Sequence, residues 1–401
     1  MTGAIERQFD VAIAGGGPAG SSAAIQLALA GARVLLVEQK KFPRTKLCGE
    51  FISPECISHF ERLGVATEML AAGGVSITTT VFYARNGASV NLPSEWFKPG
   101  TTALGLSRSE MDQRLLNRAK QVGVTVLEDA HASGLLRVDQ CVSGIVVKTG
   151  EDLREYGAAL VIDATGRNRT LAREHDHDAS DARRPELVAF KAHFESARVQ
   201  DGACEIYFYK HGYGGLSGVE NGLSNLCFIV AARDVRRHSS DPETVMREVV
   251  MKNKRAAYTL GDARSQTPWL SVSLRGFGRN AVAPEPGLLA IGDAASFIDP
   301  FTGSGMLMAL ESGRLVAEVI KEHLPHLREN VALLSREYEA AYSATFQSRL
   351  RTAGLLRRAA FVPGLAGAAI RLSRVSARVR RQLARATHQS AVPSVDVSSI
   401  R

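Results

Sequence analysis

Long apolar runs are missing from this sequence, although 45% of its 401 residues are hydrophobic. A helix that spans a membrane needs about 20 consecutive apolar residues, and no stretch of the chain approaches that length. The first residues, MTGAIERQFDVAIAGGG, also lack the basic and apolar segments of a secretory signal. We therefore expect neither a transmembrane helix nor export.

Cysteine is scarce and unpaired in the sequence. The five cysteines stand at positions 48, 56, 141, 204 and 227, with no CxxC pair and no spacing typical of metal ligands. An odd number of scattered cysteines in a large chain indicates reduced thiols. These features predict a cytoplasmic protein without a metal site.

Acidic residues are missing from one long segment near the C-terminus. Residues 340–395 contain ten arginines, no lysine and no acid, so the rest of the chain has 39 basic and 41 acidic residues. A nearly neutral body argues against a nucleic-acid groove. Within the predicted basic helical tail, residues 346–401, apolar side chains recur at helical spacing at Leu372, Val375, Val379 and Leu383. That pattern suits either peripheral contact with the inner face of a membrane or packing on the body.

What is present begins with a nucleotide-binding pattern. A short apolar strand at Val11–Ala14 leads into GGGPAG, in which Gly15, Gly17 and Gly20 form GxGxxG around Pro18 and Ala19. Such glycines allow a tight turn, approach to a pyrophosphate and close packing of the following helix. Glu38 ends the next apolar strand, where a carboxylate suits a ribose 2′-hydroxyl. The segment predicts a dinucleotide site.

Two later segments indicate which dinucleotide is bound. An apolar strand at 288–291 runs into Gly292-Asp293 and then into a glycine-rich turn before a helix. Pro300, Gly303, Gly305 and Met306 belong to this turn and helix start. An acid at a strand end can bind a polyol chain, and a helix N-terminus can face an anionic ring edge. A further apolar strand at 159–163 ends in Asp163-Ala-Thr-Gly166.

Together these motifs resemble the FAD-dependent oxidoreductase superfamily with the p-hydroxybenzoate hydroxylase fold. It includes single-component FAD monooxygenases, geranylgeranyl reductases and flavin-dependent halogenases. The resemblance implies FAD as the cofactor. The glycines at 15, 17 and 20 would hold its pyrophosphate, Glu38 its adenosine ribose and Asp293 its ribityl chain, while Gly303–Met306 would meet the flavin ring. LSRSEMDQRLLNRA resembles the family helix whose arginine reaches FAD, here Arg108; the alternative for Arg108 is a solvated charge.

The segment KKFPRTKLCGEF combines features of two branches of the family. It resembles PRxKxCGG of the geranylgeranyl reductases and FPRxxxGESLLP of the halogenases. The resemblance places Cys48, Gly49 and Glu50 near the flavin, and Arg44 and Lys46 near its ring or phosphates. Cys48 either lines the flavin pocket or is an ordinary buried residue.

Departures from the family motifs bear on the reaction. The halogenase WxWxIP motif is absent, and no tryptophan occurs between positions 96 and 269. The Asp-Gly motif of the aromatic hydroxylases is replaced by Thr165-Gly166, which leaves the route of flavin reduction open. No catalytic residue is assigned. Cys48, Glu50 and Tyr213 are candidates by position, and His193, Tyr207, Tyr209 and His211 share the predicted substrate region.

The predicted architecture is α/β, with a doubly wound FAD-binding domain like that of glutathione reductase. Residues 1–75, 103–183 and 281–345 would form it. Residues 76–102 and 184–280 would form an antiparallel sheet that caps the flavin, followed by the helical tail.

The expected function is an NAD(P)H-dependent monooxygenase that hydroxylates an aromatic, polyketide or lipid-like molecule through a flavin C4a-hydroperoxide. Alternatives are flavin hydride transfer to an isoprenoid C=C bond, halogenation, and a flavin-binding subunit without catalysis. The monooxygenase needs O2 to form its product, whereas flavin hydride transfer to a C=C bond does not. Oxygen dependence therefore separates these two functions.

Overall fold

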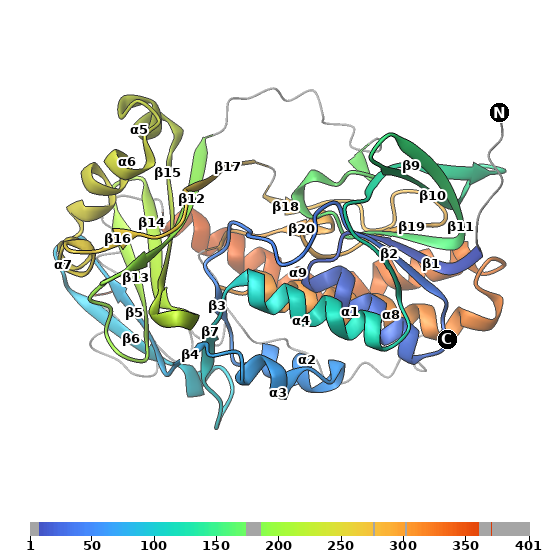
Figure 1. Ribbon diagram of the computed structural model, residues 1–401, viewed down its shortest axis with the longest axis horizontal. Helices are drawn as coiled ribbons and strands as arrows, with labels where there is room; N and C mark the ends of the chain where they lie inside the picture. The colour runs from blue at the N-terminus through green and yellow to red at the C-terminus, as the bar shows by residue number, and fades with distance from the viewer. Residues whose placement is uncertain (1–7, 174–185, 276, 301–302, 361–369, 371–401) are drawn as a thin grey trace.

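Two large sheets lie at opposite ends of the molecule, with helices crossing between them (Figure 1). The computed structural model describes residues 8–173, 186–275, 277–300, 303–360 and 370. The mixed α/β fold predicted from the sequence is confirmed.

The first sheet has the order β8-β2-β1-β11-β10-β9, and β19 also pairs with β11. Its strands are β1 (Gln8–Ala14), β2 (Val34–Val37), β8 (Thr125–Leu127), β9 (His131–Val138), β10 (Cys141–Thr149), β11 (Asp152–Asp163) and β19 (Leu288–Ala290). The pairs around β1 are parallel, whereas β9, β10 and β11 are antiparallel. Parallel strands buried on both faces are expected to be uniformly apolar, as in the fully buried Val34–Val37.

Helices α1 (Pro18–Leu29), α4 (Arg108–Gln121), α8 (Gly305–His323) and α9 (Val331–Ala360) share one hydrophobic core with this sheet. Figure 1 shows α1, α4 and α8 running side by side beneath β1 and β2. Helices α2 (Cys56–Leu63) and α3 (Ala66–Leu70) extend the same core. Because β1 leads directly into α1 and β19 leads towards α8, both helix N-termini lie at the carboxyl edge of the sheet.

The second sheet has the order β16-β12-β15-β14-β13-β5-β6, and β17 also pairs with β12. Its strands are β5 (Thr79–Tyr83), β6 (Ser89–Pro93), β12 (Leu187–Glu195), β13 (Ala203–Tyr209), β14 (Gly212–Gly218), β15 (Ser224–Ala231), β16 (Arg264–Ser265) and β17 (Leu270–Leu274). Helices α5 (Ala232–Arg237), α6 (Pro242–Glu248) and α7 (Lys254–Leu260) pack on its outer face. These helices do not cover the inner face, which is turned towards the first sheet.

Two small sheets connect the large ones. One contains β3 (Phe51–Ile52), β7 (Ala103–Gly105) and β4 (Val75–Ile77), and the other contains β18 (Gly278–Arg279) and β20 (Ser296–Phe297). The strand β3 directly follows the segment that contains Cys48 and Glu50. That segment is thereby placed at the junction of the two halves.

Local details of the second sheet differ from the prediction. The glycines between 212 and 215 indicate a turn in the sequence, but that prediction was wrong, because these residues belong to β14 and the chain turns at Lys210-His211, where His211 has a φ of 61°. The sheet is also not entirely antiparallel, since β5 is parallel to β13. The amphipathic helix predicted at 372–383 lies outside the described residues, and the domain boundaries stay a prediction.

One buried ion pair between α2 and α8 gives a first testable prediction. Glu311 contacts His59 at 3.0 Å and Arg314 at 2.6 Å. Burial raises the pKa of Glu311, but hydrogen bonds from His59 and Arg314 outweigh it and bring the pKa to about 2, from an ordinary 4.5. A depressed carboxyl pKa stabilises the fold above the unfolded value, and this is lost as the pH falls from about 4.5 towards 2.

Glu311→Gln should therefore lower the free energy of unfolding by about 3 kcal/mol at pH 7 and flatten its dependence on pH below 5. Urea unfolding at several pH values measures both effects. The control is Glu318→Gln, which removes the exposed partner of the same Arg314 and should cost less than about 1 kcal/mol. Equal losses for the two variants would contradict this account.

Candidate active site

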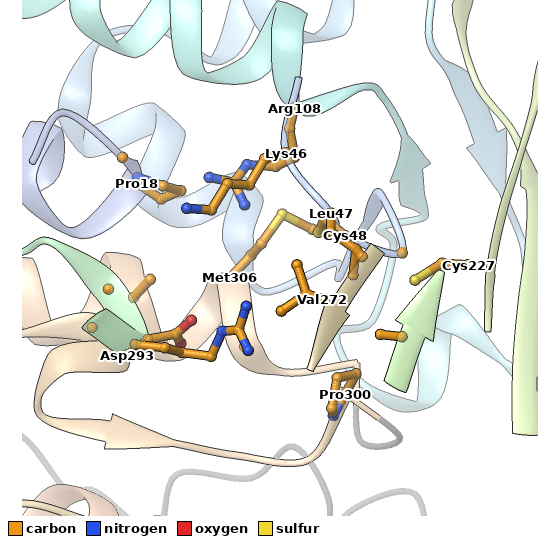
Figure 2. Close-up of a pocket in the computed structure, with 18 of the residues that line it drawn as sticks. Pro18, Lys46, Leu47, Cys48, Arg108, Cys227, Val272, Asp293, Pro300 and Met306 are labelled. Carbon is orange, nitrogen blue, oxygen red and sulfur yellow. The ribbon is translucent and has the colours of Figure 1, made fainter. Parts of the chain in front are cut away.

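A cavity of about 880 Å³ lies between the two sheets, within the size range of small-molecule sites. Figure 2 shows Pro18, Lys46, Arg108 and Asp293 in one part of it and Cys227 in another, with Leu47, Cys48, Val272 and Met306 between them. Every predicted cofactor-binding residue except Gly20 lines this cavity, together with Cys48, Glu50 and Tyr213. Their contacts with a bound molecule stay predictions.

Steric limits require glycine at two positions of the first turn, Gly15 and Gly20. Gly15 has a φ of +105°, and a Cβ on it would lie 2.4 Å from the carbonyl oxygen of Ala164. A Cβ on Gly20 would lie 1.9 Å from the carbonyl oxygen of Gly15, so α1 can approach the turn only with glycine there. Gly17, the N-cap of α1, faces open space in which the nearest atoms belong to Arg44 and Arg108.

Positive charge gathers at this open end of α1. Arg108 is 8% exposed, and its guanidinium makes two hydrogen bonds to Asp112, at 2.9 and 2.8 Å. Arg44 contacts the same carboxylate at 3.2 Å. Burial, reinforced by Arg44 and Arg108, lowers the pKa of Lys46. Because α1 also has no acid in its first turn, this end of the cavity favours a polyanion.

Arg108 is therefore a buried ion, and the alternative of a solvated charge at a helix start was wrong. Its burial follows from Asp112, one turn further along α4, which neutralises it. Glu38 lies nearby at the end of β2 and accepts hydrogen bonds from the backbone N–H groups of Gly16 and Lys40.

A second helix start meets the cavity from the other side. Gly303 has a φ of +65°, and α8 begins at Gly305 without an acid in its first turn. Asp293 also lines the cavity, and burial raises the pKa of its carboxyl despite the nearby Arg167 and Lys46. Asp163, by contrast, serves the fold, because its carboxylate accepts four hydrogen bonds from Thr165, Leu171 and Ala172.

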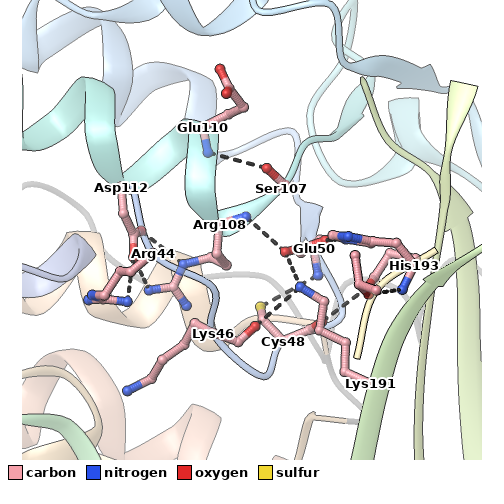
Figure 3. A network of polar contacts seen from close by, with 12 residues as sticks. Arg44, Lys46, Cys48, Glu50, Ser107, Arg108, Glu110, Asp112, Lys191 and His193 are labelled. Atoms are coloured by element: carbon pink, nitrogen blue, oxygen red, sulfur yellow. Dashed lines mark hydrogen bonds and ion pairs between the residues drawn. The ribbon is translucent and has the colours of Figure 1, made fainter. Parts of the chain in front are cut away.

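Glu50 is the centre of a buried polar network (Figure 3). Its carboxylate accepts hydrogen bonds from the backbone N–H of Arg108, at 2.9 Å, and from the amino group of Lys191, and it contacts His193 Nε2 at 2.6 Å. Burial raises the pKa of Glu50, but the hydrogen bonds and charges of His193 and Lys191 outweigh it, so the pKa is lowered. Residues 46–50, here called the 46–50 loop, are thus tied both to α4 and to β12.

The inner face of the second sheet changes from polar to apolar across its width. The strand register aligns Lys191, Cys227, Gly215, Ile206, Phe82 and Val90 in one row from β12 to β6. The polar end is engaged by Glu50. The other end forms the apolar arm of the cavity, which we define by Phe82, Val90, Leu92, Ile206 and Phe208.

The remaining candidates from the sequence are distributed differently. Tyr213 lines the cavity and donates a hydrogen bond to Asp299, whereas Tyr207 and Tyr209 pack on the outer face of the sheet. His211 lies 3.6 Å from Asp234, away from the cavity lining. Among the described residues, no group of three His, Cys, Asp or Glu side chains could hold a metal ion.

The geometry agrees with a comparison with known protein families. Residues 8–342 match the family model described as "FAD binding domain". The chain belongs to this family. The resemblance to FAD-dependent oxidoreductases with the p-hydroxybenzoate hydroxylase fold is confirmed, and FAD is the cofactor of this family.

Two curated relatives of this FAD-binding protein are reductases by name. The menaquinone reductase of Mycolicibacterium smegmatis is 28% identical over 78% of this chain and 76% of its own. Digeranylgeranylglycerophospholipid reductase 2 of Methanopyrus kandleri is 26% identical over 86% of this chain and 85% of its own.

Solved structures with low identity share the fold. The myxobacterial chondrochloren halogenase has a TM-score of 0.77 at 20% identity, covering 98% of this chain and 99% of its own. A geranylgeranyl bacteriochlorophyll reductase-like protein of Thermoplasma acidophilum has a TM-score of 0.74 at 20% identity, covering 98% and 95%.

The residues of this FAD-binding protein fit the cofactor in two respects. A Cβ would fill the space above Gly17, and Arg44 Nε and Nη1 are buried beside it with ion-pair contacts but no hydrogen bond to a described residue, which suits an anionic group such as a pyrophosphate. The start of α8, which lines the cavity and has no acid in its first turn, would offer positive potential to an anionic ring edge. Within the described part of the chain, no helix is long and apolar enough to cross a membrane.

Proposed function

We propose that this protein is an FAD-dependent reductase that saturates a carbon–carbon double bond in a lipid-like prenyl substrate. This was the second prediction from the sequence. The apolar arm carries the proposal, because it suits a hydrocarbon chain and presents no charged side chain to it. The two curated relatives are named as reductases of a menaquinone and of a digeranylgeranylglycerophospholipid, which supports a reductase with a lipid-like substrate.

Bound FAD, once reduced, supplies a hydride; we propose a reduced pyridine nucleotide as its electron source. The protein's own residues would bind the cofactor and orient the substrate. Arg44, Lys46 and Arg108 would hold the negative charge of the cofactor, and the start of α8 would stabilise negative charge on the ring. The apolar arm excludes water and aligns the substrate chain with the 46–50 loop.

The deciding experiment is a turnover assay without oxygen. Chemically reduced protein, mixed anaerobically with a prenylated quinone, should yield a product that still carries two additional hydrogens, located in the prenyl chain by fragment masses, after any quinol has been reoxidised to the quinone. Hydroxylation, which the sequence favoured, is the second candidate, because the apolar arm would also suit a hydrophobic substrate of a hydroxylase. A product that forms only with O2 and contains an added oxygen would overturn the reductase and establish hydroxylation.

Gly215 gives a test of the apolar arm. It lines the cavity, and a Cβ on it would lie 3.1 Å from Ile206 Cδ1. Gly215→Val should narrow the entrance to the arm, so kcat/KM for a long prenyl substrate should fall roughly ten-fold or more. A short-chain analogue should be affected less, and FAD content should stay unchanged. Equal losses for both chain lengths would contradict this placement.

A further inference from the structure

We propose that a second pocket, beside the main cavity, binds a phosphate group carried by the lipid substrate. This pocket has a volume of about 310 Å³ and does not share the cations at the start of α1. Among the described residues, one acid, Asp293, lines it against four arginines, and we call it the arginine pocket: Arg167, Arg169, Arg173 and Arg275. The inference rests on the proposed function and specifies the chemical class of its substrate.

Three of these arginines carry charge that the described residues leave unbalanced. Arg167, Arg173 and Arg275 form no ion pair with an acidic side chain in the described part of the chain. By contrast, Arg108 and Arg255 each pair with a carboxylate. Guanidinium groups that converge on one hollow favour an anion, and their planar forks suit the oxygens of a phosphate.

The carboxylate of Asp293 is a weak counter-ion for this pocket. Burial lowers the pKa of Arg167, and the charge of Asp293 offsets this only in part. Burial also raises the pKa of Asp293 itself. Arg167 donates a hydrogen bond to the carbonyl oxygen of Ser273 at 3.3 Å, which is a neutral acceptor. A bound phosphate would therefore supply negative charge that the pocket lacks.

Hydrogen bonds hold the wall of the arginine pocket in place. Arg169 is 4% exposed and donates to the carbonyl oxygen of Ala294, and Asn280 donates to the same oxygen at 3.3 Å. The backbone N–H of Arg173 donates to the carbonyl oxygen of Arg169 at 2.8 Å. The segment that carries the arginines is thus fixed to the segment that carries Asp293, which lowers the ordering cost of binding.

The arginine pocket continues into the main cavity. Arg167, Asp293 and Phe297 line both hollows. Phe297 also belongs to the hydrophobic cluster that contains Val90 and Phe208 of the apolar arm. A charged wall and an apolar wall therefore meet at Phe297. This arrangement suits an amphiphile with its phosphate in the pocket and its hydrocarbon chain towards the arm.

The same wall favours a lipid over a nucleotide as the source of the phosphate. Phe297 is 8% exposed and stacks on Phe277 with a centroid distance of 4.8 Å. The guanidinium of Arg167 lies 5.1 Å from the centroid of the same ring. Little of this ring is left to stack on an adenine base, which a pyridine nucleotide would present.

The test compares the pocket variant, Arg173→Gln with Arg275→Gln, with a control that loses the same charge. The control is Arg236→Gln with Arg237→Gln, two exposed positions on α5 outside both linings. The probes are geranylgeranyl monophosphate and geranylgeraniol, which differ only in the phosphate. In anaerobic turnover driven by dithionite, the wild type should have the higher kcat/KM for the phosphate. The pocket variant should lower this preference roughly ten-fold or more.

The control variant should keep the wild-type preference, and FAD content should be equal in all proteins. An unchanged preference in the pocket variant would overturn the proposal.

A binding measurement on the oxidised holoprotein needs no turnover. Calorimetry should show tighter binding of geranylgeranyl monophosphate than of geranylgeraniol, and the pocket variant should lose this difference. If the wild type shows the difference but saturates neither probe, the proposed function fails and the phosphate site stands. If it saturates both probes with equal kcat/KM and binds both equally, the phosphate site is overturned and the proposed function stands.

The electron donor separates the two sources of phosphate. NADPH carries one phosphate more than NADH, so the rates at which the two reduce the flavin anaerobically are compared in the wild type and the pocket variant. Their ratio should be the same in both proteins, because the site is assigned to the lipid. A pocket variant that loses a preference for NADPH but keeps the preference between the prenyl probes would overturn this assignment.

Discussion

Glu50→Ala is expected to lower the free energy of unfolding by about 3–5 kcal/mol, the usual cost of leaving a buried charge without its partner. Lys191 is 2% exposed, and in this variant it would retain only the carbonyl oxygen of Lys46 among the contacts given for its amino group. The backbone N–H of Arg108 would lose its acceptor as well. Denaturant unfolding of the holoprotein measures the loss.

The same interaction has a definite pH dependence. Because the folded protein depresses the pKa of Glu50, the carboxylate stabilises the fold above its ordinary value of 4.5, and this contribution is lost as the pH falls below that value. Wild-type stability should therefore decline in acid more steeply than that of Glu50→Ala. Unfolding curves of both proteins, measured from about pH 3 to about pH 7, make this comparison.

A matched control lies in the second sheet, which also contains Lys191 and His193, the partners of Glu50. Glu205 is also fully buried and pairs with Arg255, but it lies on the outer face of β13. Glu205→Ala should cost comparable stability without altering the flavin absorbance or FAD affinity. Glu50→Ala should alter both, because it releases the 46–50 loop. Identical flavin properties in the two variants would argue against this role of Glu50.

The second large effect is expected for Gly20→Ala. The added methyl group would lie 1.9 Å from the carbonyl oxygen of Gly15, so α1 must move away from the turn. This displaces the open end of α1 from Arg44 and Arg108, and we expect FAD affinity to fall roughly 100-fold or more. Fluorescence of FAD released on dilution measures the affinity.

Gly354→Ala is the control for this substitution. Gly354 lies in α9 with nothing within 4 Å of an added Cβ. Alanine favours a helix over glycine by about 1 kcal/mol, so this variant should be slightly more stable and keep its FAD. Full FAD occupancy in Gly20→Ala under dilute conditions would show that the close contact is not needed for binding.

The parts of the site that sequence reasoning reached are those encoded by local patterns. Gly15, Gly17, Gly20 and Asp293 are predicted by a strand, a turn and a helix that follow one another along the chain. The same holds for Arg108, although only the structure explains why it can be buried, through Asp112. These features need no knowledge of distant segments.

The parts that were missed depend on contacts across the chain. Lys191 is 141 residues from Glu50, and its one signal is a charge within the apolar strand LVAFKAHFE. The apolar arm arises from register between β13 and β5, a parallel pairing that alternation cannot reveal. The turn at Lys210-His211 was missed because the glycines that follow it lie within β14 and not in the turn itself.

The network around Glu50 also constrains how this protein can vary. An uncharged residue at position 50 would leave Lys191 as an isolated buried cation, and an uncharged residue at 191 would leave an acid facing His193 alone on that strand. Substitutions at these two positions are therefore expected to occur together in related sequences. The 46–50 loop and β12 should therefore vary together, through paired substitutions at positions 50 and 191.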